Sequence, residues 1–313
     1  MFKWKKLGRI FNPADIRDSW IKEYAQAPSV IIFENYVRVY FSSRPLPDAN
    51  KQYVSRLAFI DLRKDNLSEI INICKDPILP LGELGTFDEF GTYPASAIRT
   101  DDEIRIYYAG WTRCESVPFN AAIGLAFSHD GGSTFVKAGK GPVLCYTPDE
   151  PFVLGSPKIR KFNDTWYLWY SAGKKWINSE PRPEPVYKIR MAQSTDGINW
   201  VKNGKDLIEN VLEPDECQAS ADVFFFKGLY HMFFSYRYHL SKVYHIGYAS
   251  SNDLLSWNRD DSKAGMEKSG EGWDSDAVSY PCVFEMNGKV YMFHQGNEIG
   301  RYGFGLAEME SYN

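Results

Sequence analysis

Five copies of one pattern run through the chain, each made of two β-branched and aromatic runs joined by a short polar turn. Such paired runs predict β-hairpins. The spacing between successive copies is 60 to 66 residues, measured at the anchor residues Pro28, Pro94, Pro157, Ala221 and Pro281. Five copies at nearly constant spacing indicate a repeat architecture in which each copy is one structural unit.

Each hairpin is followed by a third predicted strand, and three copies continue into a polar turn and a fourth strand. The fourth strands open alike, at Phe135-Val136-Lys137, Trp200-Val201-Lys202 and Trp257-Asn258-Arg259. Four antiparallel strands in about 60 residues are typical of a propeller blade. The sequence therefore predicts an all-β, five-bladed β-propeller with four-stranded antiparallel blades.

The fifth copy lacks a fourth strand, because the chain ends soon after Glu308. Trp4-Lys5-Lys6 matches the fourth-strand opening, so we expect Phe2–Ile10 to complete the last blade and close the ring. Closure removes an exposed sheet edge. No linker divides the chain, and residues 1–313 are predicted to form a single domain.

Composition narrows the range of partners and compartments. The net charge of −4 and the pI of about 5.8 argue against nucleic-acid or anionic-membrane partners. No run approaches the roughly 20 apolar residues of a membrane span, and the first residues lack a secretory pattern. Five cysteines without metal-like spacing favour reduced thiols in a cytoplasmic protein.

Propeller geometry places the longer loops after each second strand, and the chain before each first strand, on one face. Carboxylates recur there: Glu23, Glu89, Glu216 and Asp276 stand five positions before their anchors. Asp88, Glu150 and Asp274 lie nearby. We expect these side chains to converge on the central cavity, where crowding would raise some pKa values and leave other groups ionised. Glycoside hydrolysis needs such a separation of acid from base. Glu23 is left out of the site, because residues 20–26 could equally form a surface turn.

The repeats, the Ser-x-Asp turns and the aromatic second strands resemble those of the five-bladed propeller glycosidases, including glycoside hydrolase families 43, 32 and 130. The resemblance covers essentially the whole chain. It implies a general-acid Glu in a Glu-Cys pair, and Glu216-Cys217 is similar, although it lies in the fourth repeat rather than the third. The first blade reads Gln26-Ala27-Pro28-Ser29, without the Asp that family 43 implies. SHDGGSTF from Ser128 also fits a sialidase-type Asp-box, which is interpreted as a structural turn.

The sequence thus predicts a carbohydrate-active enzyme, either a glycosidase or a glycoside phosphorylase. Glu216 is the predicted general acid, with a raised pKa, Asp88 or Asp276 the base or nucleophile, and Glu150 a further acid. Arg44 and Arg237 end two second strands in similar contexts, and together they could clamp an anion. The predicted substrate-binding residues are Arg44, Glu89, Tyr93, Trp111, Trp176, Asp222, Tyr236, Arg237, Asp274 and His294.

The expected partner is a carbohydrate, with phosphate as an optional co-substrate. No cofactor and no metal site are predicted, and a cavity cation such as calcium is left open. Two alternatives remain at this point. One is a non-catalytic glycan-binding propeller, which the missing first-blade Asp favours. The other is a protein scaffold, which would need apolar patches on its rim.

Overall fold

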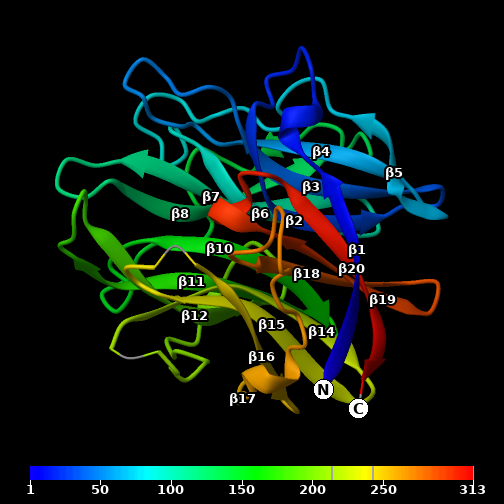
Figure 1. Ribbon diagram of the computed structural model, residues 1–313. Coiled ribbons are helices and arrows are strands. Elements are labelled where there is room, and N and C mark those ends of the chain that lie inside the picture. Colours follow the sequence, from blue (N-terminus) through cyan, green and yellow to red (C-terminus); the bar gives the residue numbers. More distant parts are fainter. Residues whose placement is uncertain (213, 242, 313) are drawn as a thin grey trace.

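The structure is a computed structural model that describes residues 1–212, 214–241 and 243–312. Its strands form five four-stranded antiparallel sheets (Figure 1). The first strands of the blades contact one another in a closed cycle, β2–β6–β10–β14–β18–β2. They therefore line the centre of a ring, and the predicted five-bladed propeller is confirmed.

Every blade is built from consecutive antiparallel hairpins, and only the fifth blade takes its outermost strand from the other end of the chain. The strands, from the innermost to the outermost, are β2 (Glu23–Ile32), β3 (Tyr36–Arg44), β4 (Arg56–Arg63) and β5 (Asn66–Ile73) in the first blade; β6 (Thr92–Arg99), β7 (Ile104–Arg113), β8 (Phe119–Ser128) and β9 (Val136–Lys137) in the second; β10 (Leu154–Phe162), β11 (Thr165–Ile177), β12 (Glu184–Ser194) and β13 (Val201–Lys202) in the third; β14 (Glu216–Phe226), β15 (Leu229–Tyr238), β16 (His245–Ser251) and β17 (Asn258–Arg259) in the fourth; and β18 (Ser279–Met286), β19 (Lys289–Gln295), β20 (Phe304–Tyr312) and β1 (Phe2–Phe11) in the fifth.

Helices are short in the described part of the chain: η1 (Pro13–Asp15), η2 (Asp261–Lys263) and α1 (Asn297–Gly300). None of them is long and apolar enough to cross a membrane.

The ring closes as the sequence predicts. Strand β1 pairs antiparallel with β20, from Phe2 opposite Tyr312 to Phe11 opposite Phe304. The two ends of the chain consequently lie close together (Figure 1). Phe2 is buried between the fourth and fifth blades, and the Trp4 indole donates a hydrogen bond to the carbonyl oxygen of Ala264 at 2.9 Å. The closing strand is thus held by packing as well as by its ladder.

Each first strand bulges at its anchor, where the pairing register with the second strand shifts. Four residues there have positive φ values between 49° and 56°, namely Ala27, Ser156, Ser220 and Tyr280. Bulges re-aim side chains. Ala27, Tyr93 and Tyr280, from three different blades, pack into one cluster at the centre of the ring.

The apolar core lies between neighbouring blades rather than in the middle of the ring. Separate clusters fill the seams between the second and third, third and fourth, and fourth and fifth blades, and the largest cluster spans the fifth, first and second. The Ser-x-Asp turns also join blades, since the hydroxyls of Tyr40 and Tyr107 donate to the turn carbonyl oxygens of Gly132 and Gly197. The Asp-box therefore has the structural role expected of it.

Candidate functional site

A pocket of about 680 Å³ opens between the first and second blades, on the face that carries the loops after the second strands. We call it the loop-face pocket. The ends of β3 and β7 and the loops after them form most of its wall, and Arg182 and Pro183 from the loop after β11 complete it. Its volume falls within the roughly 300–1,000 Å³ typical of small-molecule sites. Three predicted substrate-binding residues, Arg44, Tyr93 and Trp111, line it together.

Arg44 is held in the pocket by stacking and by one hydrogen bond. Its guanidinium carbon lies 4.0 Å from the ring centre of Tyr24 and 5.1 Å from that of Tyr53. Its Nε donates to Ser55 Oγ at 3.2 Å. Guanidinium groups stack favourably on aromatic faces, which fixes their orientation. The arginine is therefore positioned before any ligand arrives.

Aromatic rings form another side of the pocket. Trp111 and Phe119 have ring centres 4.2 Å apart, and Phe119 meets Trp176 edge-on at 5.4 Å. The Trp111 indole donates to the carbonyl oxygen of Tyr93. Trp176, also predicted to bind substrate, lies behind Phe119. Flat, half-buried rings with a polar edge suit the apolar faces of sugar rings.

The carboxylate of Glu23 lies behind the pocket wall and is bonded to Tyr53, which lines the pocket. Glu23 opens β2 and accepts hydrogen bonds from the Tyr53 hydroxyl and, at 2.8 Å, from Arg301 Nη2. The bond from Tyr53, followed by the contact with Arg301, lowers the pKa of Glu23, and the same bond raises the pKa of Tyr53. Glu23 is thus an ionised acceptor, and Tyr53 is a neutral donor that lines the pocket.

Tyrosines, rather than carboxylates, occupy the centre of the ring beside this pocket. The rings of Tyr93 and Tyr280 stack with centres 6.2 Å apart, and Tyr244 meets Tyr280 edge-on at 5.9 Å. Ile299 packs over them from α1. Burial raises the pKa of Tyr93 and that of Tyr280, so both phenols stay protonated.

The predicted anion clamp of Arg44 and Arg237 is wrong. Arg237 is buried, and its Nη1 donates to the carbonyl oxygens of Tyr238, His239 and Ser241. The guanidinium of Arg237 is therefore bonded to carbonyl oxygens of its own loop, and not free to bind an anion. Arg237 is absent from the wall of the loop-face pocket.

Four predicted site carboxylates are buried inside blades and paired with cations. Each binds a basic residue in the outermost strand of its own blade, which stands two residues after the aromatic residue of the fourth-strand opening. The pairs are Asp88 with Lys137 at 2.5 Å, Glu150 with Lys202, Glu216 with Arg259 at 2.7 Å, and Asp274 with Lys6 at 2.6 Å.

Tyrosine or histidine side chains from the second strands add to these pairs. Tyr108 donates to Asp88, Tyr170 donates to Glu150, and His294 lies 3.3 Å from Asp274. Arg190 also contacts Glu150 at 3.1 Å. Among the described residues, no hydrogen bond or ion pair links one of these four carboxylates to another. Each carboxylate is therefore held by partners of its own blade, and the convergence on a central cavity stays a prediction.

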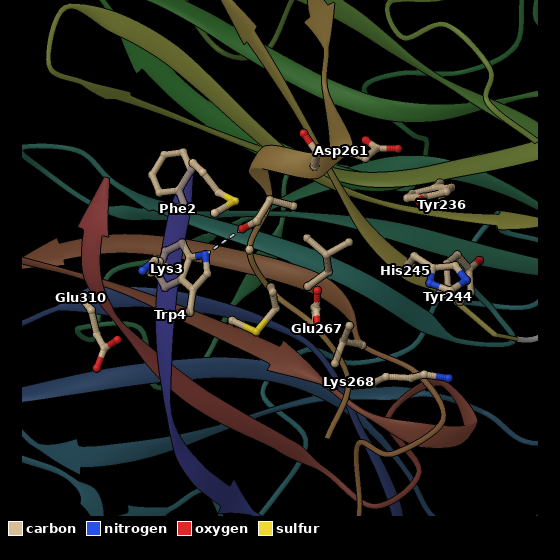
Figure 2. A pocket seen from close by; sticks show the side chains of 17 residues that line it. Phe2, Lys3, Trp4, Tyr236, Tyr244, His245, Asp261, Glu267, Lys268 and Glu310 are labelled. Atoms are coloured by element: carbon tan, nitrogen blue, oxygen red, sulfur yellow. Dashed lines mark hydrogen bonds between the residues drawn. The ribbon is translucent and has the colours of Figure 1, made fainter. Parts of the chain in front are cut away.

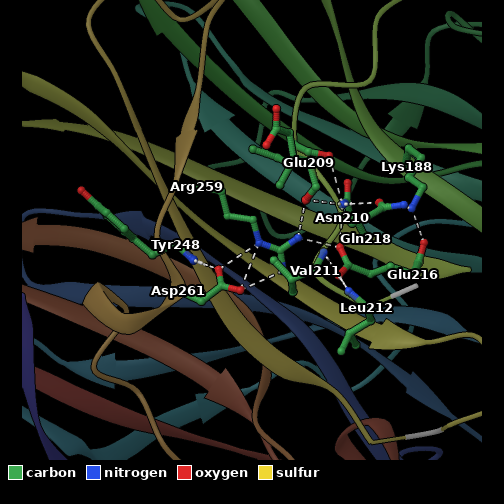
Figure 3. A network of polar contacts seen from close by, with 11 residues as sticks. Lys188, Glu209, Asn210, Val211, Leu212, Glu216, Gln218, Tyr248, Arg259 and Asp261 are labelled. Atoms are coloured by element: carbon green, nitrogen blue, oxygen red, sulfur yellow. Dashed lines mark hydrogen bonds and ion pairs between the residues drawn. The ribbon is translucent and has the colours of Figure 1, made fainter. Parts of the chain in front are cut away.

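The predicted raised pKa of Glu216 is also wrong. Figure 3 shows Glu216 among the groups that donate hydrogen bonds to it, Arg259, Gln218, Val211 and Leu212. Burial alone would raise the pKa, but hydrogen bonds from Arg259, Gln218 and the backbone of Val211 outweigh burial and lower it. Leu212 N donates as well, at 2.9 Å. A carboxylate with this many donors is held ionised, so it is poorly suited to give up a proton.

The pKa of Asp274 is lowered in the same way. Burial acts against it, and the bonds from His294, Lys6 and Ser269 prevail. Burial lowers the pKa of His294, which is fully enclosed in the fifth blade. Both residues were predicted to bind substrate, and their contacts instead lie within the blade.

The remaining predicted residues lie apart from one another. Asp276 is exposed, and Glu89 accepts a hydrogen bond from the backbone of Gly85. Asp222 joins three blades, since it accepts bonds from Arg160 Nη2 at 2.7 Å and from the backbone of Val283. The catalytic roles assigned to Glu216, Asp88, Glu150 and Asp276 stay predictions.

Tyr236 lines a second hollow, of about 610 Å³, between the fourth and fifth blades. Figure 2 shows Phe2, Lys3 and Trp4 on one side of it and Tyr236 and His245 on the other. The rings of Tyr236 and His245 have centres 5.5 Å apart. This groove follows the seam that β1 closes.

Within residues 1–212, 214–241 and 243–312, no group of three His, Cys, Asp or Glu side chains is arranged to hold a metal ion.

Two proteins of Mycobacterium tuberculosis, from strains CDC 1551 and H37Rv, match this chain along almost its whole length. Each is an uncharacterized protein, 33% identical over 309 residues, which covers 98% of this chain and 99% of the relative. The chain belongs to their family. No family model matches it.

Solved structures similar to this family member are five-bladed propellers of glycoside hydrolases. A glycoside hydrolase aligns with a TM-score of 0.77 at 16% identity, over 100% of this chain and 93% of the other. A thermostable family-43 glycoside hydrolase aligns with a TM-score of 0.67 at 14% identity, over 95% of this chain and 93% of the other. A third structure comes from family 130 of mannoside phosphorylases, a family described as containing glycoside hydrolases that target β-1,2-mannosidic linkages in Candida mannan. It aligns with a TM-score of 0.70 at 13% identity, over 98% of this chain and 94% of the other. These likenesses establish the fold.

The sequence reasoning missed Tyr53, which lines the pocket, and Glu23, which is bonded to Tyr53 behind the pocket wall. Glu23 belongs to the series of acids five positions before the anchors, and it was set aside because residues 20–26 resembled a surface turn. In the structure Glu23 is the first residue of β2. Tyr53 lies in the loop after β3, one of the longer loops predicted on this face, and no sequence pattern distinguishes it from the other loop residues.

Proposed function

We propose that this protein is a carbohydrate-active enzyme, a glycoside hydrolase or a phosphorylase-like enzyme, and that its glycan binds in the loop-face pocket. The main support is that one pocket combines sugar-sized volume, the Trp111–Phe119 wall, a positioned arginine and a tyrosine-linked carboxylate. The fold, shared with glycoside hydrolases at low identity, is consistent with this proposal.

Carboxylate chemistry in this pocket would involve Glu23 and Glu115. Glu23 is ionised and is linked to the pocket by Tyr53, so it can accept a proton through the tyrosine hydroxyl. Glu115 is the carboxylate among the described lining residues, and it is exposed. We assign Glu23 as the base that accepts a proton through Tyr53, and Glu115 as the lining carboxylate that binds sugar hydroxyls.

A glycan panel assayed for turnover, with and without phosphate, tests this proposal. We expect release of a reducing sugar, or of a sugar phosphate when phosphate is present. Glu23→Gln should reduce kcat by about 10²–10⁴-fold, the usual contribution of general acid–base catalysis. Glu285→Gln, an exposed acid that does not line the pocket, is the matched control. Full activity in Glu23→Gln would refute the assignment.

A non-catalytic glycan-binding protein is the second candidate. It is favoured by the five bulge positions at the centre of the ring, Ala27, Tyr93, Ser156, Ser220 and Tyr280, none of which is a carboxylate. The same panel separates the two functions, because a pure binder would show affinity for a glycan without turnover of it.

A further inference from the structure

Arg44 has unused binding capacity. Nε is bonded to Ser55, but no hydrogen bond or ion pair occupies the two terminal nitrogens within the described ranges. Stacking on Tyr24 and Tyr53 already fixes the plane of the group. A guanidinium held in this way presents parallel N–H donors that match a carboxylate or a phosphate.

Tyr93 supplies a second open donor in the same pocket. The residue is 6% exposed, and its buried hydroxyl oxygen has no close hydrogen-bond partner in the described chain; the Tyr280 hydroxyl is the group that interacts with it. Leaving a buried polar group unpaired costs about 1–3 kcal/mol. Burial raises the pKa of Tyr93 and keeps the phenol protonated. The positive charge of Arg44 acts in the opposite direction on this pKa, which indicates that the two groups are close together. A ligand atom that accepts a hydrogen bond would satisfy the hydroxyl.

Among the cations that line the pocket in the described chain, Arg44 is the one stacked on two aromatic rings. Arg113 is bonded to Asp48 at 2.6 Å, and Arg182 lies 3.7 Å from Glu184. Lys51 is a further, exposed cation on the wall, and Glu115 is the acid there.

Glu23 is the cross-strand partner of Arg44, and the charge of Arg44 acts on its carboxylate. The positive charge of Arg44 contributes to the lowered pKa of Glu23, after the larger effects of Tyr53 and Arg301. The two oxygens of Glu23 bind Tyr53 and Arg301 and form no bond with Arg44. A fixed arginine without a direct carboxylate bond, near a hydroxyl that lacks a close partner, is suited to bind an anion.

We propose that the loop-face pocket recognises a sugar carrying an anionic group, a carboxylate or a phosphate ester, which Arg44 and Tyr93 bind. This inference rests on the proposed function and adds the class of substrate. The sugar ring then lies against Trp111, and the charged substituent points toward the centre of the propeller.

Titration calorimetry with matched sugars tests the proposal. The probes are glucose, galactose and mannose, the corresponding uronic acids, the corresponding 6-phosphates, and inorganic phosphate alone. We expect at least one acidic sugar to bind ten-fold or more tightly than its neutral parent. Arg44→Gln should abolish that preference, and Tyr93→Phe should reduce it several-fold. Arg113→Gln, in the same pocket but paired with Asp48, should retain it.

The outcomes separate this inference from the proposed function. Equal affinity for neutral and acidic sugars, or a preference that survives Arg44→Gln, refutes the anionic-sugar site and leaves glycan binding intact. Inorganic phosphate that binds as tightly as the acidic sugars also refutes it, because the site would then recognise a free anion. Failure of every sugar to bind contradicts the proposed function as well. Circular dichroism of each variant verifies that it is folded.

Discussion

Replacing Glu216 with alanine should destabilise the whole protein. The side chain is fully buried and accepts hydrogen bonds from Arg259 Nη1 at 2.7 Å, Gln218 Nε2 at 2.7 Å, Val211 N at 3.0 Å and Leu212 N at 2.9 Å. Removing one partner of a buried ion pair costs about 3–5 kcal/mol. Arg259 keeps its contacts with Asp261, so we expect a loss in this range rather than above it.

Asp276→Ala is the matched control. Asp276 stands at the same distance before its anchor as Glu216 does, but it is exposed, and no hydrogen bond of its side chain occurs in the described chain. Surface changes of this kind usually alter the free energy of unfolding by about 0.5 kcal/mol or less. Urea unfolding followed by tryptophan fluorescence gives both values, and unchanged slopes allow the midpoints to be compared.

The pH dependence of the Glu216 contribution has a definite sign. The folded state lowers the pKa of Glu216 below its ordinary 4.5. The ionised carboxylate therefore stabilises the protein fully above that value, and the stabilisation is lost as the pH falls through the lowered pKa. The stability gap between wild type and Glu216→Gln should narrow in acid. Glu216→Ala unfolding at the same urea concentration as Asp276→Ala, with catalysis lost, would refute this reasoning and restore Glu216 as the general acid.

Three further changes test other parts of the structure. Deleting residues 1–10 should lower the melting temperature, because it removes buried Phe2 and the Lys6–Asp274 pair and exposes the edge of β20; an unchanged melting temperature would contradict ring closure by β1. Trp111→Ala should weaken binding of whichever glycan the panel identifies by about ten-fold, equivalent to about 1.4 kcal/mol, and calorimetry showing wild-type affinity would move the sugar elsewhere. Asp130 has a pKa of about 2, because hydrogen bonds from Thr134, Ser128 and Ser133 outweigh its burial; the stability that it adds above its ordinary 3.8 should disappear as the pH falls toward 2, and acid unfolding curves of Asp130→Asn that match wild type would exclude that contribution.

The fold was predictable because each blade repeats one pattern of strands and turns. The Trp4-Lys5-Lys6 opening even revealed the strand that crosses from one end of the chain to the other. The same opening also contributes a buried ion pair, which the sequence did not predict. Its basic residue is the partner of a buried carboxylate, as in Arg259 with Glu216, and the two members are 43 residues apart in that pair.

The sequence predicted which residues stand at the ends of strands, but not which of them line the pocket, because that depends on the conformation of the loops. Arg44 and Arg237 follow similar sequences, YFSSR and FFSYR, and both end second strands. Only Arg44 lines the loop-face pocket, because the loop after Arg237 folds back and offers it carbonyl oxygens. Pairing of this kind depends on tertiary geometry, which composition and spacing do not encode.

The position of a bound sugar tests the central claim most directly. A crystal structure of the protein with the tightest-binding glycan of the panel should show a sugar ring against Trp111 and its charged group within hydrogen-bonding distance of Arg44 and Tyr93. A sugar bound instead beside Glu216, or in the groove lined by Tyr236 and His245, would contradict the account.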